Sequence, residues 1–288
     1  MHSLTPAPAL QPFVRQLWYA ESPAEASAVR EHVLPTGQMH LVFRLEGPAL
    51  KLFTGPDDLT GSIVREPVVV GPRASFYAKE SGASVTSIGV QLLPGAAMGL
   101  FGVSAAELAE RHTPLSDLWG AAGRSALDQM AQARDPQACL QTLESILARQ
   151  LPRIKAMHPA VAQLLARPGQ LARIDTLVRD SCYSHRGFIA LFRQATGMSP
   201  KRYARLMRFR AVLASLRRQP GVPLGMLALD AGYSDQSHMQ REFRAFAGLT
   251  PLQYLQRDPA EANHVVLRQV NFVQDRASAA RYSASSLT

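Results

Sequence analysis

Polar, aromatic and turn-forming residues recur in the last third of the chain as two copies of one pattern. The copies read Asp180-Ser-Cys-Tyr-Ser184, Phe192-Arg193 and Gly197-Met-Ser-Pro200 first, then Asp230-Ala-Gly-Tyr-Ser234, Phe243-Arg244 and Gly248-Leu-Thr-Pro251. Each copy is typical of a helix-turn-helix unit, in which a short helix supports a second helix and leaves one face of it open. Such a face fits the DNA major groove, which is roughly 12 Å wide. The duplication therefore predicts contacts with two adjacent stretches of major groove.

The two copies differ in length by one residue. Tyr183 and Tyr233 are offset by 50 positions, whereas Phe192 and Phe243 are offset by 51. The extra residue therefore falls at the start of the second helix of the second unit.

Caps and turns in this region predict where the helices begin and end. Ser184 and Ser199 suit N-cap positions, and Pro200 suits the first position of a helix. Gly197 and Gly248 suit left-handed caps at the ends of the two second helices. The expected helices span 159–166, 171–180, 184–196, 200–217, 222–231, 235–247 and 251–256.

The positive charge of the chain is concentrated in the region of the repeat. Residues 151–258 hold 17 Lys+Arg and 6 Asp+Glu, a net charge of +11. The remaining 180 residues hold 14 and 16, a net charge of −2. A basic region joined to a nearly neutral one indicates a phosphate-binding domain attached to a second domain. An arginine-rich solvated helical face is the alternative, which charge alone does not exclude.

Residues 159–257 resemble the DNA-binding domain of the AraC/XylS family of bacterial transcription regulators. The resemblance rests on Ala231-Gly-Tyr-Ser-Asp-Gln-Ser-His238, Phe243-Arg244 and Gly248-Leu-Thr-Pro-Leu-Gln-Tyr254. In that family two helix-turn-helix units, joined by a long helix, bind successive major grooves on one face of the duplex. The joining helix here would span 200–217. Groove segments on one face recur about every 34–36 Å, so the connector must match that separation or the DNA must bend.

The resemblance implies base contacts on the open face of each second helix. Glutamine pairs with adenine and arginine with guanine, each contributing roughly 1–3 kcal/mol of discrimination. In the first unit isoleucine and alanine offer only apolar contact, so Arg186 would be its main polar reader and the units need not share specificity equally. The expected base-reading residues are Arg186, Ile189 and Ala190 in the first unit and Gln236, Ser237, Gln240 and Arg241 in the second.

Three arginines are expected to contact the DNA backbone. Arg193 and Arg244 end the two second helices, and Arg202 lies on the connector. For Arg193 and Arg244, a solvated side chain at a helix end is nearly as well supported as a phosphate contact. The large apolar residues of the motif, such as Phe188 and Met239, are expected to pack in the core.

Residues 1–115 are predicted to be rich in β-strands. Short apolar stretches, such as 39–43 and 68–70, alternate there with glycine and proline turns, which is typical of a small barrel or sandwich. The segments Arg30–Gly37 and Ile88–Gly95 also resemble an uncharacterised N-terminal domain found in many such regulators. That resemblance implies a sensing or dimerisation domain but no known ligand.

The remaining segments complete an α+β fold with three further parts. Residues 116–155 are expected to form a helical linker, and residues 156–258 an all-α domain with the two helix-turn-helix units. Just before the linker, Ser104 and Glu107 predict a capping box. In the tail, 259–288, the apolar run Val265–Leu267 either pairs as a strand or stays loose.

Candidate sites in the N-terminal domain are weaker. His32 and His40, with Glu31 beside them, are residue types that bind metals. No third ligand has compelling spacing, so we favour ordinary surface or strand histidines. Core packing is likewise favoured over a ligand pocket for the aromatic residues Trp18, Tyr19, Phe43, Phe76 and Tyr77. No motif of a hydrolase, zinc protease or phosphate-binding loop occurs. We therefore expect no catalysis, no metal and no cofactor.

Three functional classes remain open. The preferred one is a sequence-specific transcription regulator, with double-stranded DNA as partner and a small-molecule effector, a homodimer or both through the N-terminal domain; the family also implies RNA polymerase. A second is an enzyme with an appended DNA-binding domain, such as a repair alkyl-acceptor, which requires an activated thiol at Cys139 or Cys182. A third is a non-specific architectural DNA binder. The two unpaired cysteines, the absence of a secretion signal and the lack of a long apolar run favour the bacterial cytoplasm over a membrane.

Overall fold

The computed structural model describes most of the chain. The described residues are 2–24, 29–54, 58, 60–133, 135–151, 159–166, 184–219 and 221–267. The helix expected over 171–180 lies outside them, as do Asp180, Cys182 and everything beyond residue 267.

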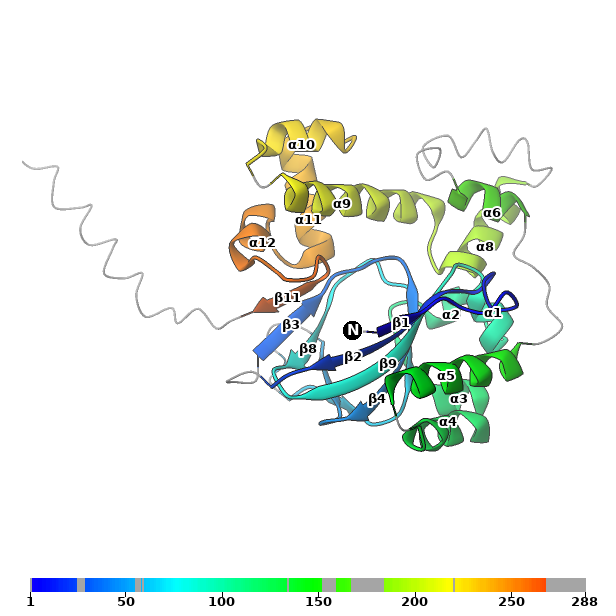
Figure 1. The fold of residues 1–288 in the computed structure, drawn as a ribbon. Coiled ribbons are helices and arrows are strands. Elements are labelled where there is room, and N and C mark those ends of the chain that lie inside the picture. The colour runs from blue at the N-terminus through cyan, green and yellow to red at the C-terminus, as the bar shows by residue number, and fades with distance from the viewer. Residues whose placement is uncertain are drawn as a thin grey trace, which may run out of the picture.

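The N-terminal region contains two antiparallel sheets (Figure 1). The six-stranded sheet has the order β1 (His2–Leu4), β2 (Val14–Ser22), β9 (Val85–Leu92), β4 (Met39–Glu46), β7 (Val68–Val70) and β10 (His112–Pro114). The five-stranded sheet has the order β11 (His264–Leu267), β3 (Val29–Val33), β8 (Tyr77–Ser81), β5 (Leu50–Phe53) and β6 (Ser62–Val64). The expected β-rich region is confirmed.

The main core of this region lies on one face of the six-stranded sheet. Met39, Leu41 and Phe43 of β4 point to that face and are buried, as the two-residue period of a strand requires. They pack in one cluster with Leu140 and Leu143 of the covering helices. The helices that contribute to this core are α1 (Ala96–Phe101), α2 (Ala105–Leu108), α3 (Leu115–Trp119), α4 (Ala121–Ala131) and α5 (Pro136–Gln150).

The short helix α2 (Ala105–Leu108) precedes strand β10. Its N-terminus carries the predicted capping box: the Ser104 hydroxyl accepts from the Ala106 N–H, and the Glu107 carboxylate accepts from the Ser104 N–H. Because these bonds satisfy backbone donors that a helix leaves open, they fix the start of α2 and the path by which the chain enters it.

The C-terminal region is helical, as expected. Serines 184 and 199 and Thr250 accept hydrogen bonds from backbone N–H groups as N-caps, and Gly197 and Gly248 end their helices in the left-handed conformation. These caps explain why the predicted boundaries agree with the structure to within two residues. The helices are α6 (Pro159–Ala166), α8 (His185–Thr196), α9 (Pro200–Arg218), α10 (Leu224–Asp230), α11 (Gln236–Ala247) and α12 (Pro251–Arg257).

The segment after α12 returns to the N-terminal region. Strand β11 pairs antiparallel with β3, so that His264 lies opposite Val33 and Leu267 opposite Arg30. The open question of the apolar run at 265–267 is thus answered: it forms the edge strand of the five-stranded sheet.

The α+β class expected from the sequence is confirmed by this arrangement, in which the helical region lies over one side of the sheets (Figure 1). Within the described residues, no helix is both long enough and apolar enough to cross a membrane.

Candidate DNA interface

Helix α11 presents a buried and an open face. Asp235 caps its N-terminus by accepting a hydrogen bond from the backbone N–H of His238 at 2.7 Å, and this bond is the main cause that lowers the pKa of Asp235. Met239, Phe243 and Phe246 on one side are buried. The four predicted base readers gather on the other side: Gln236, Ser237 and Arg241 are exposed and Gln240 is half-buried.

Helix α8 repeats this arrangement with fewer polar groups. Its cap, Ser184, accepts from the backbone N–H of Gly187 at 3.1 Å, and Phe188 and Phe192 are fully buried. Their cluster includes Val161 of α6. The predicted readers lie on the opposite side, with Arg186 and Ala190 exposed and Ile189 half-buried. Their exposure fits the predicted role, and base contact itself stays a prediction.

The caps show where the extra residue of the second unit falls. The side chains of Ser184 and Asp235 bond to the third residue after themselves, and they are 51 positions apart. The insertion therefore precedes the cap, and the helices match with one offset throughout. His238 lies next to the inserted Ser234, whose hydroxyl is 3.1 Å from the His238 Nδ1 atom. This contact gives His238 a structural role in the turn.

Helix α9 joins the two units. Its 19 residues correspond to a length of about 28 Å, somewhat less than the roughly 34–36 Å between groove segments on one face. Leu206, Phe209 and Leu213 are buried along it. Phe209 also contacts the rings of Phe243 and Phe246 of α11, at 5.1 and 5.0 Å between centroids. The second unit is thus packed directly on the connector.

A buried carboxylate connects α11 to α9. The side chain of Glu242 is 8% exposed, and its Oε1 atom lies 2.5 Å from Arg205 Nε. Arg208 Nη2 is 3.7 Å from Oε2, and the Arg208 guanidinium lies over the Tyr233 ring at 5.0 Å. Burial, and then the Glu242 charge, raise the pKa of Tyr233. Arg205 and Arg208 of α9 therefore connect the two helices through Glu242, although both side chains stay partly exposed.

The three predicted phosphate contacts differ in their surroundings. Arg193 and Arg244 are exposed in the last turns of α8 and α11. Arg202, in the first turn of α9, forms an ion pair with Glu110 at 2.9 Å between Nη2 and Oε1. Arg202 would have to exchange this carboxylate for a phosphate to bind DNA. All three remain predictions.

We call α8 and α11, the second helices of the two units, the recognition helices. Both contact the N-terminal region with their C-terminal ends. The Ala195 carbonyl of α8 accepts from Gly95 N–H at 2.9 Å, and the Phe246 carbonyl of α11 accepts from Phe76 N–H at 3.0 Å. Each helix has 12 residues and is about 18 Å long. Their N-terminal turns, which approach base edges in helix-turn-helix proteins, therefore lie on the side away from the sheets (Figure 1).

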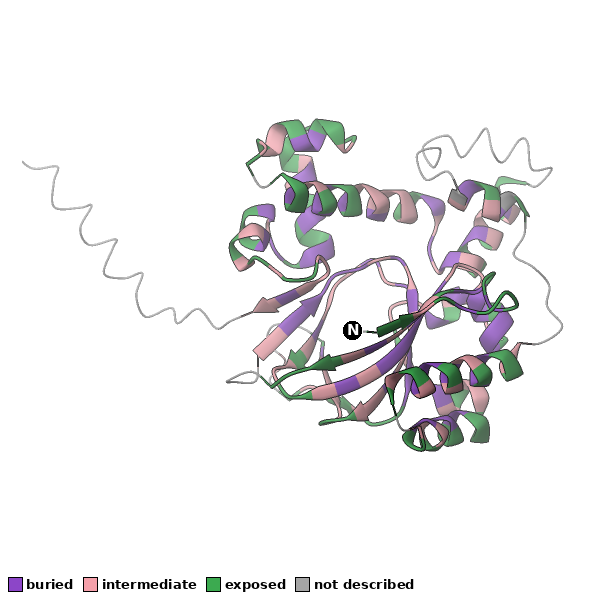
Figure 2. Ribbon diagram, viewed as in Figure 1, coloured by how far each residue is buried: buried purple, intermediate pink, exposed green. Residues whose placement is uncertain are grey.

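The N-terminal histidines and aromatic residues considered as metal ligands or pocket residues make packing and hydrogen-bond contacts within the protein. His32 stacks on Phe76 at 4.1 Å, and its Nδ1 atom is 3.1 Å from the Ala247 carbonyl oxygen; burial lowers its pKa. Burial lowers the pKa of His40 to about 4. In the described part of the chain, no group of three or more metal-ligating side chains comes together. Tyr19 and Phe43 belong to the core, whereas Trp18 is only partly buried. Buried and more exposed residues occur together along the strands of this region (Figure 2).

Two structural residues stand outside the repeated pattern of the sequence. Glu242 has no counterpart in the first unit, where Leu191 occupies the matching position. Glu110 lies in the other domain and is 92 residues away from Arg202. The sequence marks Glu242 only by its being an acidic residue in a strongly basic helical region.

Known proteins resemble both halves of the chain. A family model described as a helix-turn-helix domain matches residues 177–257, and a domain of unknown function (DUF6597) matches residues 2–114. An uncharacterized HTH-type transcriptional regulator of Haemophilus influenzae is 30% identical over 100 residues, which are 35% of this chain. The match spans about a third (33%) of the length of that relative.

Solved structures with a similar arrangement include ToxT from Vibrio cholerae. One is 9% identical and covers 83% of this chain and 97% of that chain, with a TM-score of 0.43. Another, of unsaturated fatty acid bound wild-type ToxT, is 12% identical and covers 83% and 94%, with a TM-score of 0.41. Neither similarity is strong enough to bear on ligands or partners.

The paired recognition helices on one connector, together with the two family matches, define a DNA-binding domain of the helix-turn-helix class that is joined to a second domain. The signature residues in the second unit narrow this class. The helical region matches the AraC type of this class, and the β-rich N-terminal region matches a domain of unknown function.

Proposed function

We propose that this protein regulates transcription by reading two short DNA boxes, one with α8 and one with α11. The observation that carries the proposal is the open face on each helix, which extends from a capped N-terminal turn pointing away from the sheets. Phosphate contacts by Arg193, Arg202 and Arg244 would set the position on the duplex, and base contacts would supply sequence discrimination.

The two helices have different capacities for base recognition. Helix α11 offers two glutamines, Gln236 and Gln240, and the guanidinium of Arg241, which suit adenine and guanine edges. Helix α8 offers Arg186 with two apolar neighbours, so its box would be read less strictly. We therefore propose that α11 contributes most of the sequence specificity.

The proposed partners beyond DNA follow from the class of protein. The N-terminal domain would bind a small-molecule effector, form a homodimer, or both, and RNA polymerase would be contacted at the promoter. Effector binding would act by shifting the population of domain arrangements. The bacterial cytoplasm is the proposed location, because the DNA partner is there.

Selection of random duplex DNA near physiological salt tests the proposal. The wild type should enrich two boxes about one helical turn apart. Arg241→Ala should relax one position of one box, with a loss of roughly 1–3 kcal/mol of discrimination there, while leaving the other box intact. Arg111→Ala, which removes an exposed arginine of the N-terminal region, is the matched control.

Other outcomes of the selection would favour the alternatives. A single enriched box would mean that α8 contacts phosphates only. Steep salt dependence without any enriched sequence would indicate an architectural binder. Cys139 does not support the alkyl-acceptor alternative, because it is buried in α5 and burial raises the pKa of its thiol, whereas that chemistry needs a thiolate. Cys182, the other cysteine named for it, lies outside the described residues.

A further inference from the structure

The equivalent glycine turns of the two units press against one short segment of the N-terminal region. We call this segment, residues 71–76 between β7 and β8, the seat. A Cβ atom added at Gly197 would overlap with Pro72, and one added at Gly248 would lie 2.5 Å from Cζ of Phe76. Both glycines have a positive φ, at 76° and 70°. Each turn therefore contacts the seat so closely that a side chain could not be accommodated without a shift.

Backbone hydrogen bonds also join the N-terminal region to the ends of α8 and α11. Phe76 N–H binds the Phe246 carbonyl at the end of α11, and Gly95 N–H binds the Ala195 carbonyl at the end of α8. The last carbonyls of a helix have no partner within the helix. Their use here fixes the C-terminal ends of both recognition helices to the N-terminal region.

Glu110 holds the seat in its conformation. Its carboxylate accepts from Ala74 N–H at 2.9 Å and from the Ser75 hydroxyl at 2.8 Å, and its own N–H donates to the Pro72 carbonyl at 3.1 Å. Its backbone φ is 60°, a left-handed conformation that costs energy for a residue other than glycine. The same carboxylate binds Arg202 at the start of α9. One side chain thus joins the seat to the connector.

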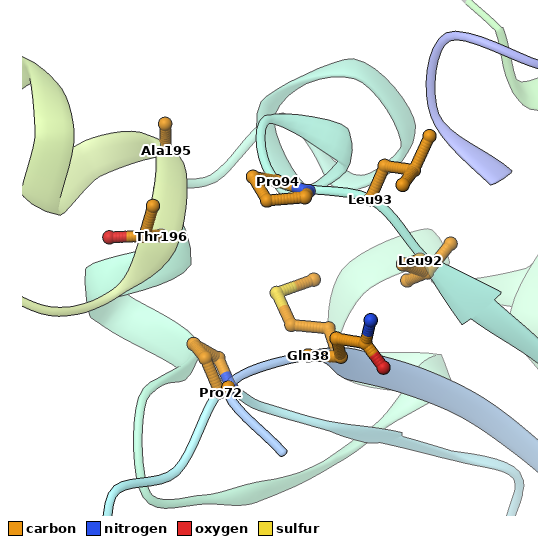
Figure 3. A pocket seen from close by; sticks show the side chains of 9 residues that line it. Gln38, Pro72, Leu92, Leu93, Pro94, Ala195 and Thr196 are labelled. Carbon is orange, nitrogen blue, oxygen red and sulfur yellow. The ribbon is translucent and has the colours of Figure 1, made fainter. Parts of the chain in front are cut away.

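The contact between the first unit and the sheets leaves little free space. Residues of the N-terminal region and of α8 enclose a cavity of about 10 Å³, enough for one water molecule at most. Pro72 and Pro94 line it from one side and Ala195 and Thr196 from the other (Figure 3). Further along, a Cβ at Gly37 would lie 2.9 Å from Leu206 of α9. The two units cannot move independently without opening this contact.

The first unit depends on the seat more than the second does. Residues of α9 that pack against the α8 cluster, Tyr203, Ala204 and Met207, are only partly buried. By contrast, α11 is fixed to α9 by three aromatic rings and by Glu242. The connector alone therefore orients α11 but constrains α8 less.

We propose that the seat, held by Glu110, sets the separation of the two recognition helices and so the spacing of the DNA boxes that the protein accepts. The inference rests on the proposed two-box function and adds spacing selectivity to it. Each base pair moves a box by about 3.4 Å along the duplex and rotates it by about 35°. A closely packed seat cannot follow such a step, so both helices would no longer engage together.

The test measures binding to duplexes in which the two selected boxes are separated by the preferred spacing or by one base pair more or less. The wild type should lose about tenfold or more in affinity at the altered spacings, since two linked modules lose their joint advantage when geometry prevents simultaneous contact. Glu110→Gln, which keeps the size of the side chain but removes its charge, should reduce this loss to about threefold or less. Because the substitution also releases Arg202, a predicted phosphate contact, the loss at altered spacings is measured as a ratio of affinities within each variant.

Two further variants make the result specific. Glu80→Gln removes a carboxylate that pairs with Lys51 at the surface and should keep the wild-type spacing preference. Ser75→Ala removes one hydrogen bond to Glu110 and should broaden the preference in the same direction, so it carries the test if Glu110→Gln does not fold. An unchanged spacing preference in folded Glu110→Gln and Ser75→Ala would overturn the inference and leave the two-box function standing. A wild type that selects no paired boxes would overturn both.

Discussion

Glu242 of α11 is a buried carboxylate whose charge is balanced by two arginines of α9. Glu242→Gln keeps one acceptor but loses the ion pairs with Arg205 and Arg208. Because the Arg205 side chain is 42% exposed and can be solvated, we expect a loss of about 1–2 kcal/mol in the free energy of unfolding. Urea unfolding measures this loss.

A double-mutant cycle with Arg205→Gln separates the pair from other effects of the substitution. The coupling energy should account for most of the loss. Additive effects of the two substitutions would show that the contact in the structure contributes nothing to stability, and that Arg205 is available to DNA after all.

We expect His112 to make the N-terminal region sensitive to acid. Burial, and then the charge of Arg73, lower its pKa to about 3, and its Nδ1 atom is 3.0 Å from Arg73 Nη2. Since the unfolded chain takes up this proton near pH 6.5, the stabilising effect is complete above that pH and is lost as the pH falls toward 3. His112→Asn, which can accept from Arg73 without titrating, should flatten the decrease in stability over this range.

The measurement is the midpoint of thermal unfolding at pH values between 7 and 4. His2→Asn, at an exposed histidine, serves as control and should keep the wild-type decrease. An equal decrease in wild type and His112→Asn would mean that other groups cause the acid sensitivity.

Residues that occur twice can be recognised from the sequence, and residues that act once cannot. The matching caps and glycines of the two units are enough to predict the helix boundaries and the open faces. Glu242 and Glu110 have no counterparts, and their partners lie 37 and 92 residues away in the sequence. Such pairs depend on how elements pack, which local spacing does not encode.

At the level of elements, the length of α9 sets the separation of the two units, and its packing sets the orientation of α11. Helix α9, about 28 Å long, places the two units roughly one helical turn of DNA apart. It fixes the orientation of α11 through Phe209 and leaves α8 to be constrained by the N-terminal region. The boundaries of α8, α9, α11 and α12 are predictable because a side-chain cap marks the start of each. The pairing of β11 with β3 is not, because a three-residue apolar run matches any open strand edge.

At the level of the whole molecule, strand β11 connects the two regions, because it follows α12 of the second unit and pairs with β3 of the N-terminal region. Burial by itself would raise the pKa of Glu31 on β3, but the hydrogen bond from His264 of β11 and the charge of Lys79 hold it lowered to about 2. The Tyr254 hydroxyl of α12 donates to the Ala262 carbonyl at 2.9 Å just before this strand. Strand β11 is thus tied to both domains.

Truncation tests whether this tie couples the domains. A chain ending at Ala262 loses β11, exposes the edge of β3 and removes the His264 partner of the buried Glu31 carboxylate. Because an unpaired buried charge and an open strand edge are both costly, amide exchange in β3 should quicken by about tenfold or more, corresponding to about 1.4 kcal/mol or more of local stability. A chain ending at Leu267 keeps the strand and should exchange like the full chain. Equal protection of β3 in both truncations would show that the N-terminal sheet is complete without its last strand.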